Sequence, residues 1–312
     1  MRPAWRPRVF DADFPCARFT CSGLADLVHF CEANSVALDF LSTHSYPTDP
    51  PNGRWSGGAG KQADTPHQLL AMQFAAKQAQ QLGKPLWITE WSSDPGSRSP
   101  YHDTTDTAAY IVSSVASVRS LGLVAYSYWT FSDVFEEGGI PGKNTPFHGG
   151  FGMINLYDVP KPSMRAFQLL NMLSDAEATA TLSGGSAPPA SLTVLATVAT
   201  GANVTVLLAN HDCSGCADPS SVEIGWVTVT AAGFVVKQVS IARIDANTTN
   251  PHAAWLALGA PNYPTPAQQV ELVAAAQLKF SLAELATAPD GNPGVSSVVV
   301  PPHAVVALVF SA

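Results

Sequence analysis

Three segments of the chain place ionisable side chains beside aromatic rings. An aromatic ring can pack on the apolar side of a sugar, while carboxylates bind its hydroxyl groups or displace a group at the anomeric carbon. The pattern therefore favours a carbohydrate site and predicts glycoside cleavage as its chemistry. The candidate residues are His44, Tyr46, Glu90, Trp91, Trp129, Phe131, Glu136 and Glu137.

Each candidate also has a purely structural interpretation. Tryptophans at these positions could belong to the core, His44 could be a hydrogen-bonded structural histidine, and Glu136 with Glu137 could be a solvated patch. Glu90 is the strongest candidate, because a glutamate that closes an apolar strand needs a compensating partner if it is buried.

Alternating helix-like and strand-like segments position these residues. The sequence Thr65-Pro-His-Gln68 has the pattern of a capping box, and Gly83 ends the helix that follows. Such an alternation predicts a parallel α/β sheet, in which functional residues gather at the carboxyl ends of the strands. We expect helices at 22–34, 65–83 and about 105–121, and strands at 38–43, 85–90 and 123–129.

The composition changes near residue 180. A turn-rich connector, 181–190, is followed by short runs rich in Val, Thr, Leu and Ala, which are typical of strands. We therefore predict two domains, an α/β domain at 1–178 and a β-sandwich at 179–312, with one long excursion at 246–290. The runs that we expect to form strands are 192–199, 203–209, 222–230, 234–244 and 298–310.

Composition and charge exclude several classes of function. The chain has 312 residues with 16 Lys and Arg against 24 Asp and Glu, a formal net charge of −8, and no basic run. Binding to nucleic acid through phosphate contacts is therefore not expected. We expect no membrane segment either, because Pro301 and Pro302 interrupt the apolar run at 298–310.

The cysteines and sequons carry little weight. Cys213-Ser-Gly-Cys216 could suggest zinc, but one such pair without a second favours a local disulfide or two free thiols. The sequons at Asn203 and Asn247 suit a secretory protein, although no signal peptide is visible behind the basic N-terminus.

Five motifs in order resemble glycoside hydrolase family 39, which contains β-xylosidases and α-L-iduronidases. The resemblance covers roughly residues 19 to 312, and the segment around Trp255 looks like the sandwich of the iduronidases. It implies a retaining hydrolase with a (β/α)8 barrel and an appended β-sandwich, and it implies no metal or organic cofactor. The motifs lie at 38–47, 87–92, 128–137, 147–155 and 161–167.

The resemblance also assigns roles to residues. Glu90 matches the catalytic nucleophile on barrel strand seven, and His44 with Tyr46 matches the sugar site after strand six. The loop after strand eight shapes the pocket wall and binds substrate. Its matching residues are Trp129, Phe131, Glu136 and Glu137, and Trp91 stands beside the nucleophile.

One part of the family pattern is missing from this sequence. The acid/base glutamate of the family lies in an Asn-Glu-Pro motif after strand four, and no Asn-Glu-Pro occurs here. A complete barrel takes at least about 200 residues, so the first 178 residues match only strands five to eight. We therefore expect a C-terminal fragment of a longer enzyme that is inactive or impaired alone. The alternatives are a non-catalytic carbohydrate-binding pseudoenzyme and one half of a two-chain glycosidase, completed by a separate N-terminal barrel half.

The resemblance gives a partial indication of substrate and location. The iduronidases carry a lysine where this chain has Tyr46, so the site favours a pentoside, as in β-xylosidases, whereas the Trp255 segment favours the iduronidases. The expected partner is a glycoside or oligosaccharide. The family also implies a secreted or lysosomal location.

Overall fold

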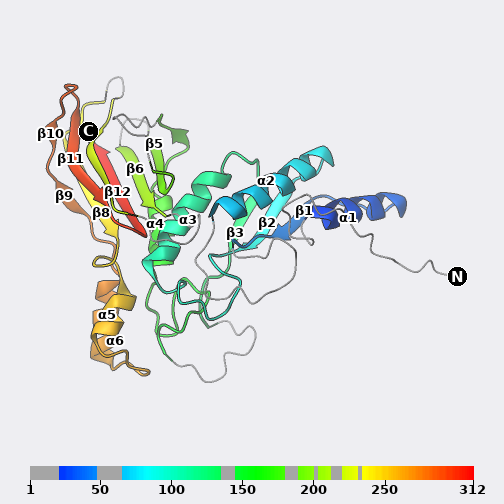
Figure 1. Cartoon of the computed structure of the whole chain (residues 1–312), viewed down its shortest axis with the longest axis horizontal. Helices are drawn as coiled ribbons and strands as arrows, with labels where there is room; N and C mark the ends of the chain where they lie inside the picture. The colour runs from blue at the N-terminus through cyan, green and yellow to red at the C-terminus, as the bar shows by residue number, and fades with distance from the viewer. Residues whose placement is uncertain are drawn as a thin grey trace.

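The structure of this protein is a computed structural model (Figure 1). Part of the chain is described below, and it includes all the strands and helices named here. The described residues are 21–47, 65–134, 145–179, 189–199, 203–211, 220–230 and 234–312.

Three parallel strands and three helices form the N-terminal part of the fold. The strands lie in the order β1-β2-β3, and both strand pairs are parallel, as the alternation of elements predicts. The elements alternate along the chain as α1 (Cys21–Ala33), β1 (Leu41–His44), α2 (Thr65–Gln81), β2 (Leu86–Trp91), α3 (Thr105–Val118) and β3 (Ala125–Tyr128).

The C-terminal part is antiparallel and forms two sheets. A six-stranded sheet has the order β4-β5-β6-β12-β8-β9, and a three-stranded sheet has the order β10-β11-β7. Apolar side chains from both sheets form one core between them. The strands are β4 (Ala176–Glu177), β5 (Leu192–Val198), β6 (Asn203–Asn210), β7 (Val222–Thr228), β8 (Gln238–Ile244), β9 (Ser281–Ala283), β10 (Ala286–Thr287), β11 (Pro293–Val300) and β12 (Ala304–Ser311).

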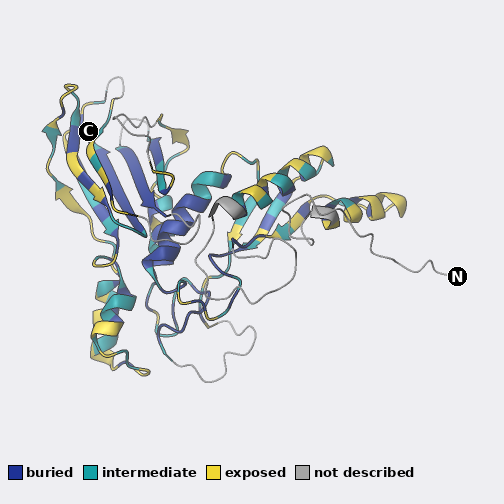
Figure 2. Ribbon diagram, viewed as in Figure 1, coloured by how far each residue is buried: buried dark blue, intermediate teal, exposed yellow. Residues whose placement is uncertain are grey.

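Helix α3 joins the two parts of the fold. Residues Thr105 to Ser114 are all buried, because the helix packs against α2 and α4 (Pro162–Leu170) on one side and against β5, β6 and β12 on the other. Figure 2 shows this helix as buried over most of its surface, between the parallel and antiparallel sheets. A single apolar cluster runs through the interface, from Ile88 and Ile111 to Leu207 and Val305.

The excursion after β8 is folded rather than extended. It contains α5 (Pro251–Ala257) and α6 (Pro266–Ala275), which pack together around Trp255 and Leu272. Helix α6 begins with a capping box in which Thr265 and Gln268 satisfy each other's backbone N–H groups. The strands β9 and β10 complete the excursion before β11.

Helices α1 and α2 and the residue before β1 carry exposed apolar side chains. Leu27 and Phe30 on α1 are 43% and 62% exposed, Leu70 on α2 is 56% exposed, and Phe40 before β1 is 47% exposed. Both β1 and β3 stand at the edges of their sheet within the described part of the chain. The N-terminal part therefore combines two sheet edges with exposed apolar side chains on its helices.

The sequence predicts a domain boundary at residue 178 and no membrane segment. Strand β4 pairs with β5 through Ala176 and Glu177, so the antiparallel sheet recruits its first strand just before the boundary expected at residue 178. Among the described residues, no helix has the length and apolar character needed to cross a membrane.

Candidate active site

Glu90 and His44 stand side by side where two neighbouring parallel strands end. The register of the sheet pairs His44 at the end of β1 with Glu90 near the end of β2. The Nδ1 atom of His44 lies 3.2 Å from Oε2 of Glu90, and the hydroxyl group of Tyr46 donates a short hydrogen bond to Oε1. Both oxygens of the Glu90 carboxylate are thus oriented by residues at the end of β1 and just after it.

A buried glutamine fixes the loop that carries Tyr46. The side-chain amide of Gln68 donates a 2.9 Å hydrogen bond to the Ser45 carbonyl oxygen, and its Oε1 atom accepts hydrogen bonds from Tyr110 and Ser114. Gln68 is fully buried. The sequence pattern assigns this residue to a helix-capping box, but its side chain instead anchors the loop after β1 from within the core.

An irregularity in β2 decides which side chains face the site. Leu86 and Ile88 are buried, Thr89 is exposed, and the next fully buried side chain is Trp91 rather than residue 90. The register shifts between Thr43 and His44 on β1 and between Ile88 and Trp91 on β2. Such bulges re-aim side chains beside active sites, and here the shift leaves Glu90 at the surface, with 20% of its side chain exposed.

Trp91 has no exposed surface and lies in the core. Its ring stacks on Tyr126 at a centroid distance of 4.0 Å and meets Tyr128 edge-on at 5.1 Å. Trp91 supports the strand that carries Glu90 and does not reach the surface where His44 lies.

The remaining sequence-predicted residues lie after β3. The Trp129 backbone N–H donates to the Trp91 carbonyl oxygen at 2.8 Å, which continues the pairing of β3 with β2 beyond the last residue of the strand, and the Trp129 side chain is partly buried. Phe131 is 62% exposed. Glu136 and Glu137 lie outside the described residues.

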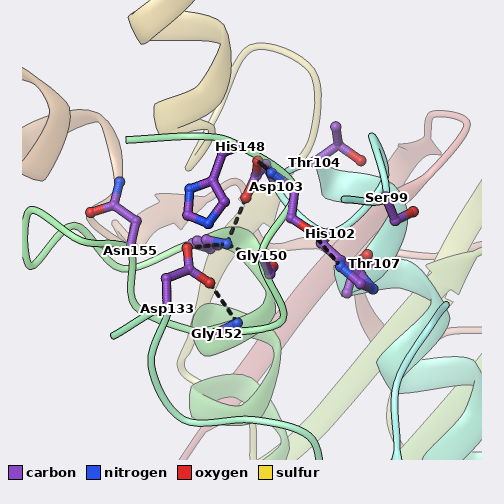
Figure 3. Close-up of polar contacts among 12 residues, drawn as sticks. Ser99, His102, Asp103, Thr104, Thr107, Asp133, His148, Gly150, Gly152 and Asn155 are labelled. Carbon is purple, nitrogen blue, oxygen red and sulfur yellow. Dashed lines mark hydrogen bonds and ion pairs between the residues drawn. The ribbon is translucent and has the colours of Figure 1, made fainter. Parts of the chain in front are cut away.

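A buried ion network connects the loops after β2 and β3 (Figure 3). The ammonium group of Lys161, just before α4, lies 2.6 Å from Asp103 and 2.7 Å from Asp133, and it donates to the Gly150 carbonyl oxygen at 3.0 Å. The Lys161 side chain has no exposed surface. Burial by itself lowers the pKa of Lys161, but the two carboxylates outweigh it and raise that pKa above its ordinary value, so the ammonium stays charged.

The same loops are held together by His102. Its Nδ1 atom lies 2.9 Å from the Gly149 carbonyl oxygen, and its Nε2 atom lies 3.2 Å from the Ser92 hydroxyl oxygen. The Nε2 atom also lies 3.1 Å from the Asp94 carbonyl oxygen, and burial lowers the pKa of His102, which favours the neutral ring. The segment directly after Glu90 and Trp91 is thus tied to the loop that contains Gly149.

Close backbone contacts in this network require glycine at position 152. A Cβ atom there would lie 2.1 Å from the Asp133 backbone nitrogen, whereas a Cβ atom on Gly225 in β7 would meet nothing within 4 Å. We expect Gly152→Ala to lower the free energy of unfolding by about 1–3 kcal/mol, measured by chemical denaturation. Gly225→Ala is the matched control and is expected to stay within about 0.5 kcal/mol of the unmodified chain. Equal stability of the two variants would contradict the close contact.

Sequence comparison identifies the family. The sequence profile of the glycosyl hydrolases family 39 matches residues 18–292. A β-xylosidase from Caldicellulosiruptor saccharolyticus is 33% identical over 286 residues, which are 91% of this chain and 56% of that protein. The chain belongs to glycosyl hydrolase family 39.

Solved structures of family 39 enzymes share the fold. A GH39 β-xylosidase from Caulobacter crescentus superposes with a TM-score of 0.66 at 24% identity, over 92% of this chain and 54% of that one. A bacterial orthologue of human α-L-iduronidase superposes with a TM-score of 0.62 at 19% identity, over 88% of this chain and 49% of that one. This chain therefore shares the fold of these family 39 enzymes over the part that it matches, and it spans about half the length of these relatives.

The structure reveals site components that the sequence motifs did not assign to the site. Gln68 and the bulge in β2 orient the Glu90 carboxylate, and Lys161 ties the loops behind it. Lys161 belongs to one of the five family 39 motifs and stands directly before a proline that opens a helix. That position is the feature of the sequence that could have marked this lysine as part of the site. Its partners Asp103 and Asp133 are distant in sequence, so no local pattern links the three residues.

Proposed function

We propose that this chain is the C-terminal part of a retaining O-glycosyl hydrolase of the β-xylosidase type, with Glu90 as its nucleophile. The observation that carries the proposal is the Glu90 carboxylate at the end of β2, held by Tyr46 on one oxygen and by His44 on the other. A nucleophile needs a fixed, accessible carboxylate at the carboxyl ends of the strands, and Glu90 meets that requirement.

In this mechanism Glu90 attacks the anomeric carbon and the bond to the leaving oxygen breaks. The resulting glycosyl ester is then hydrolysed by water, with the configuration retained. The hydroxyl group of Tyr46 holds Oε1 of the carboxylate, and Oε2, which faces the half-exposed His44, is the oxygen that forms the ester bond. His44, more than half exposed, lies where it can contact the bound sugar.

The acid/base carboxyl group belongs to the part of the enzyme that this chain does not match. A retaining enzyme needs its second carboxyl group about 5–5.5 Å from the first, and the polar partners of Glu90 described above are a phenol and an imidazole. The chain covers 56% of the Caldicellulosiruptor β-xylosidase. We propose that the missing group, with barrel strands one to four, is supplied by a longer form of the protein.

A pentoside is the substrate class that we favour. Tyr46 occupies the position beside the nucleophile and bonds the Glu90 carboxylate, and the relative that is 33% identical is named a β-xylosidase. Phe131, in the segment after β3, is exposed enough to pack on a sugar ring. A secreted or endomembrane location is proposed on family grounds.

The exposed apolar surface favours a second candidate, in which this chain is one half of a two-chain glycosidase. Phe30, Phe40 and Leu70 are each more than 45% exposed, and β1 stands at a sheet edge in the described part of the chain. A sheet edge and apolar helix faces of this kind are the surfaces that further parallel strands and helices cover in a closed barrel.

Covalent labelling tests the proposal at Glu90. The reagent is dinitrophenyl 2-deoxy-2-fluoro-β-xyloside, whose leaving group needs no proton from an acid and whose fluorine slows breakdown of the glycosyl ester. We expect the full chain to gain the mass of one fluoropentosyl unit, located at Glu90 by peptide mapping. Glu271→Gln, which alters an exposed carboxylate on α6, should label equally, and Glu90→Gln should not label.

The arms of this experiment separate the candidates. Labelling at another carboxylate would overturn the assignment of Glu90. Labelling that appears only after addition of the N-terminal half of the Caldicellulosiruptor β-xylosidase would favour the two-chain form. No label in either condition, from folded protein, would remove the hydrolase proposal and leave a carbohydrate-binding chain.

A further inference from the structure

Two histidines and one aspartate meet at the interface between α3 and the six-stranded sheet. Their ligand atoms all lie within 4.8 Å of one another. Nδ1 of His303 is 2.9 Å from Oδ2 of Asp106, and Nε2 of His211 is 3.7 Å from the same oxygen. None of the three belongs to the site around Glu90.

The sheet register explains why the two histidines face each other. His211 directly follows β6 and His303 directly precedes β12, and these antiparallel strands pair Asn210 with Ala304 at the same end. Continuing that register by one residue places the two histidines opposite each other. His303 has a φ of 52°, which few non-glycine residues adopt.

Asp106 comes from the other part of the fold. It lies in the first turn of α3, the helix that packs against both β6 and β12. Burial by itself raises the pKa of Asp106, but the imidazoles of His211 and His303 outweigh it and hold that pKa well below its usual range. The buried carboxylate thus faces two imidazoles that come from the opposite side of the interface.

We propose that Asp106, His211 and His303 form a binding site for a divalent zinc-type ion that links α3 to the six-stranded sheet. Two imidazole nitrogens and one carboxylate oxygen are a common zinc ligand set, with water in the fourth position. In a tetrahedral site with ligands at about 2.0–2.1 Å, neighbouring donor atoms are about 3.3 Å apart. The two separations to Asp106, 2.9 and 3.7 Å, bracket that value.

Burial and packing suit a structural site. The side chains of His211 and Asp106 are 0% and 6% exposed, and His303, at 17%, gives an ion access from solvent. The ring of Tyr110 packs edge-on against His211 at a centroid distance of 5.8 Å, which limits rotation of that imidazole. A bound ion would join residues from the parallel and antiparallel parts of the fold, so we expect it to stabilise their interface.

Metal titration of the full, metal-stripped chain tests the proposal. We expect calorimetry to show one Zn²⁺ bound per chain and a Tm that rises with Zn²⁺ concentration. Co²⁺ should give the visible bands of a tetrahedral site without thiolate charge-transfer absorption. His303→Gln should weaken Zn²⁺ binding by at least about 10- to 100-fold, and Asp106→Asn, which preserves the side-chain shape, should do the same.

Two controls keep the result specific. His29→Gln removes an exposed histidine on α1 and should leave Zn²⁺ binding unchanged. The double variant Cys213→Ser, Cys216→Ser should also bind normally. The proposal is overturned if the unmodified chain binds no Zn²⁺ or Co²⁺, if cobalt shows thiolate absorption, or if binding depends on the cysteines and survives His303→Gln.

Discussion

Glu90→Ala is expected to lower the hydrolysis of dinitrophenyl β-xyloside by at least about 1,000-fold relative to the unmodified chain. The activated leaving group makes protonation unnecessary, so the first step tests the nucleophile alone. The measurement is the burst of dinitrophenolate that precedes steady state, because breakdown of the glycosyl ester without a base limits steady-state release. Glu271→Gln is the matched carboxylate control on α6.

Added azide provides a second test of the nucleophile, because the configuration of the xylosyl azide product shows whether the Glu90 carboxylate took part in the reaction. In the unmodified chain, azide attacks the anomeric carbon of the glycosyl ester and releases the Glu90 carboxylate without a base, giving β-xylosyl azide with retained configuration. In Glu90→Ala, azide attacks the substrate directly, dinitrophenolate leaves, and the product is the inverted α-xylosyl azide. Retained product from Glu90→Ala would show that another residue is the nucleophile.

Lys161→Met is expected to lower the free energy of unfolding by about 3–5 kcal/mol. Lys161 is fully buried between Asp103 and Asp133 at 2.6 and 2.7 Å. Methionine has a similar length but no charge, so the variant leaves two carboxylates buried without their counter-ion. Removal of one partner from a buried ion pair has this cost, and urea denaturation followed by circular dichroism measures it.

A compensating variant tests the cause of that loss. Asp103→Asn with Asp133→Asn removes both buried charges but keeps an amide oxygen to accept the hydrogen bonds now donated by the Gly149 and Gly152 backbone N–H groups. Adding these changes to Lys161→Met should recover part of the stability. Lys237→Met, at an exposed position, should change stability by less than about 0.5 kcal/mol. Failure of the two asparagines to recover stability would indicate lost packing rather than unpaired charge.

The sequence by itself determined the elements of the N-terminal part and the residues at the strand ends. Helices and strands leave local patterns, because their side chains repeat with fixed periods and their ends carry capping or turn residues. The carboxyl ends of neighbouring parallel strands must lie together, so His44, Tyr46 and Glu90 could be grouped before their contacts were seen. The motifs that carry them also sufficed to place the chain in family 39.

Only the tertiary structure decided which of those side chains share a surface. Trp91 follows Glu90 directly, yet the bulge in β2 sends its ring into the core beside Tyr126. A bulge adds one residue to one strand of a pair. Its position depends on the register with the neighbouring strand, which the sequence of a single strand does not specify.

The buried polar clusters also required the tertiary structure. Lys161 meets Asp103 and Asp133, and Asp106 meets His211 and His303, across separations that no local pattern spans. These groups come together because α3 and the loops around it are packed between two sheets, and burial then demands that each charge find a partner. Local periodicity specifies elements, whereas the pairing of distant charges depends on how those elements pack.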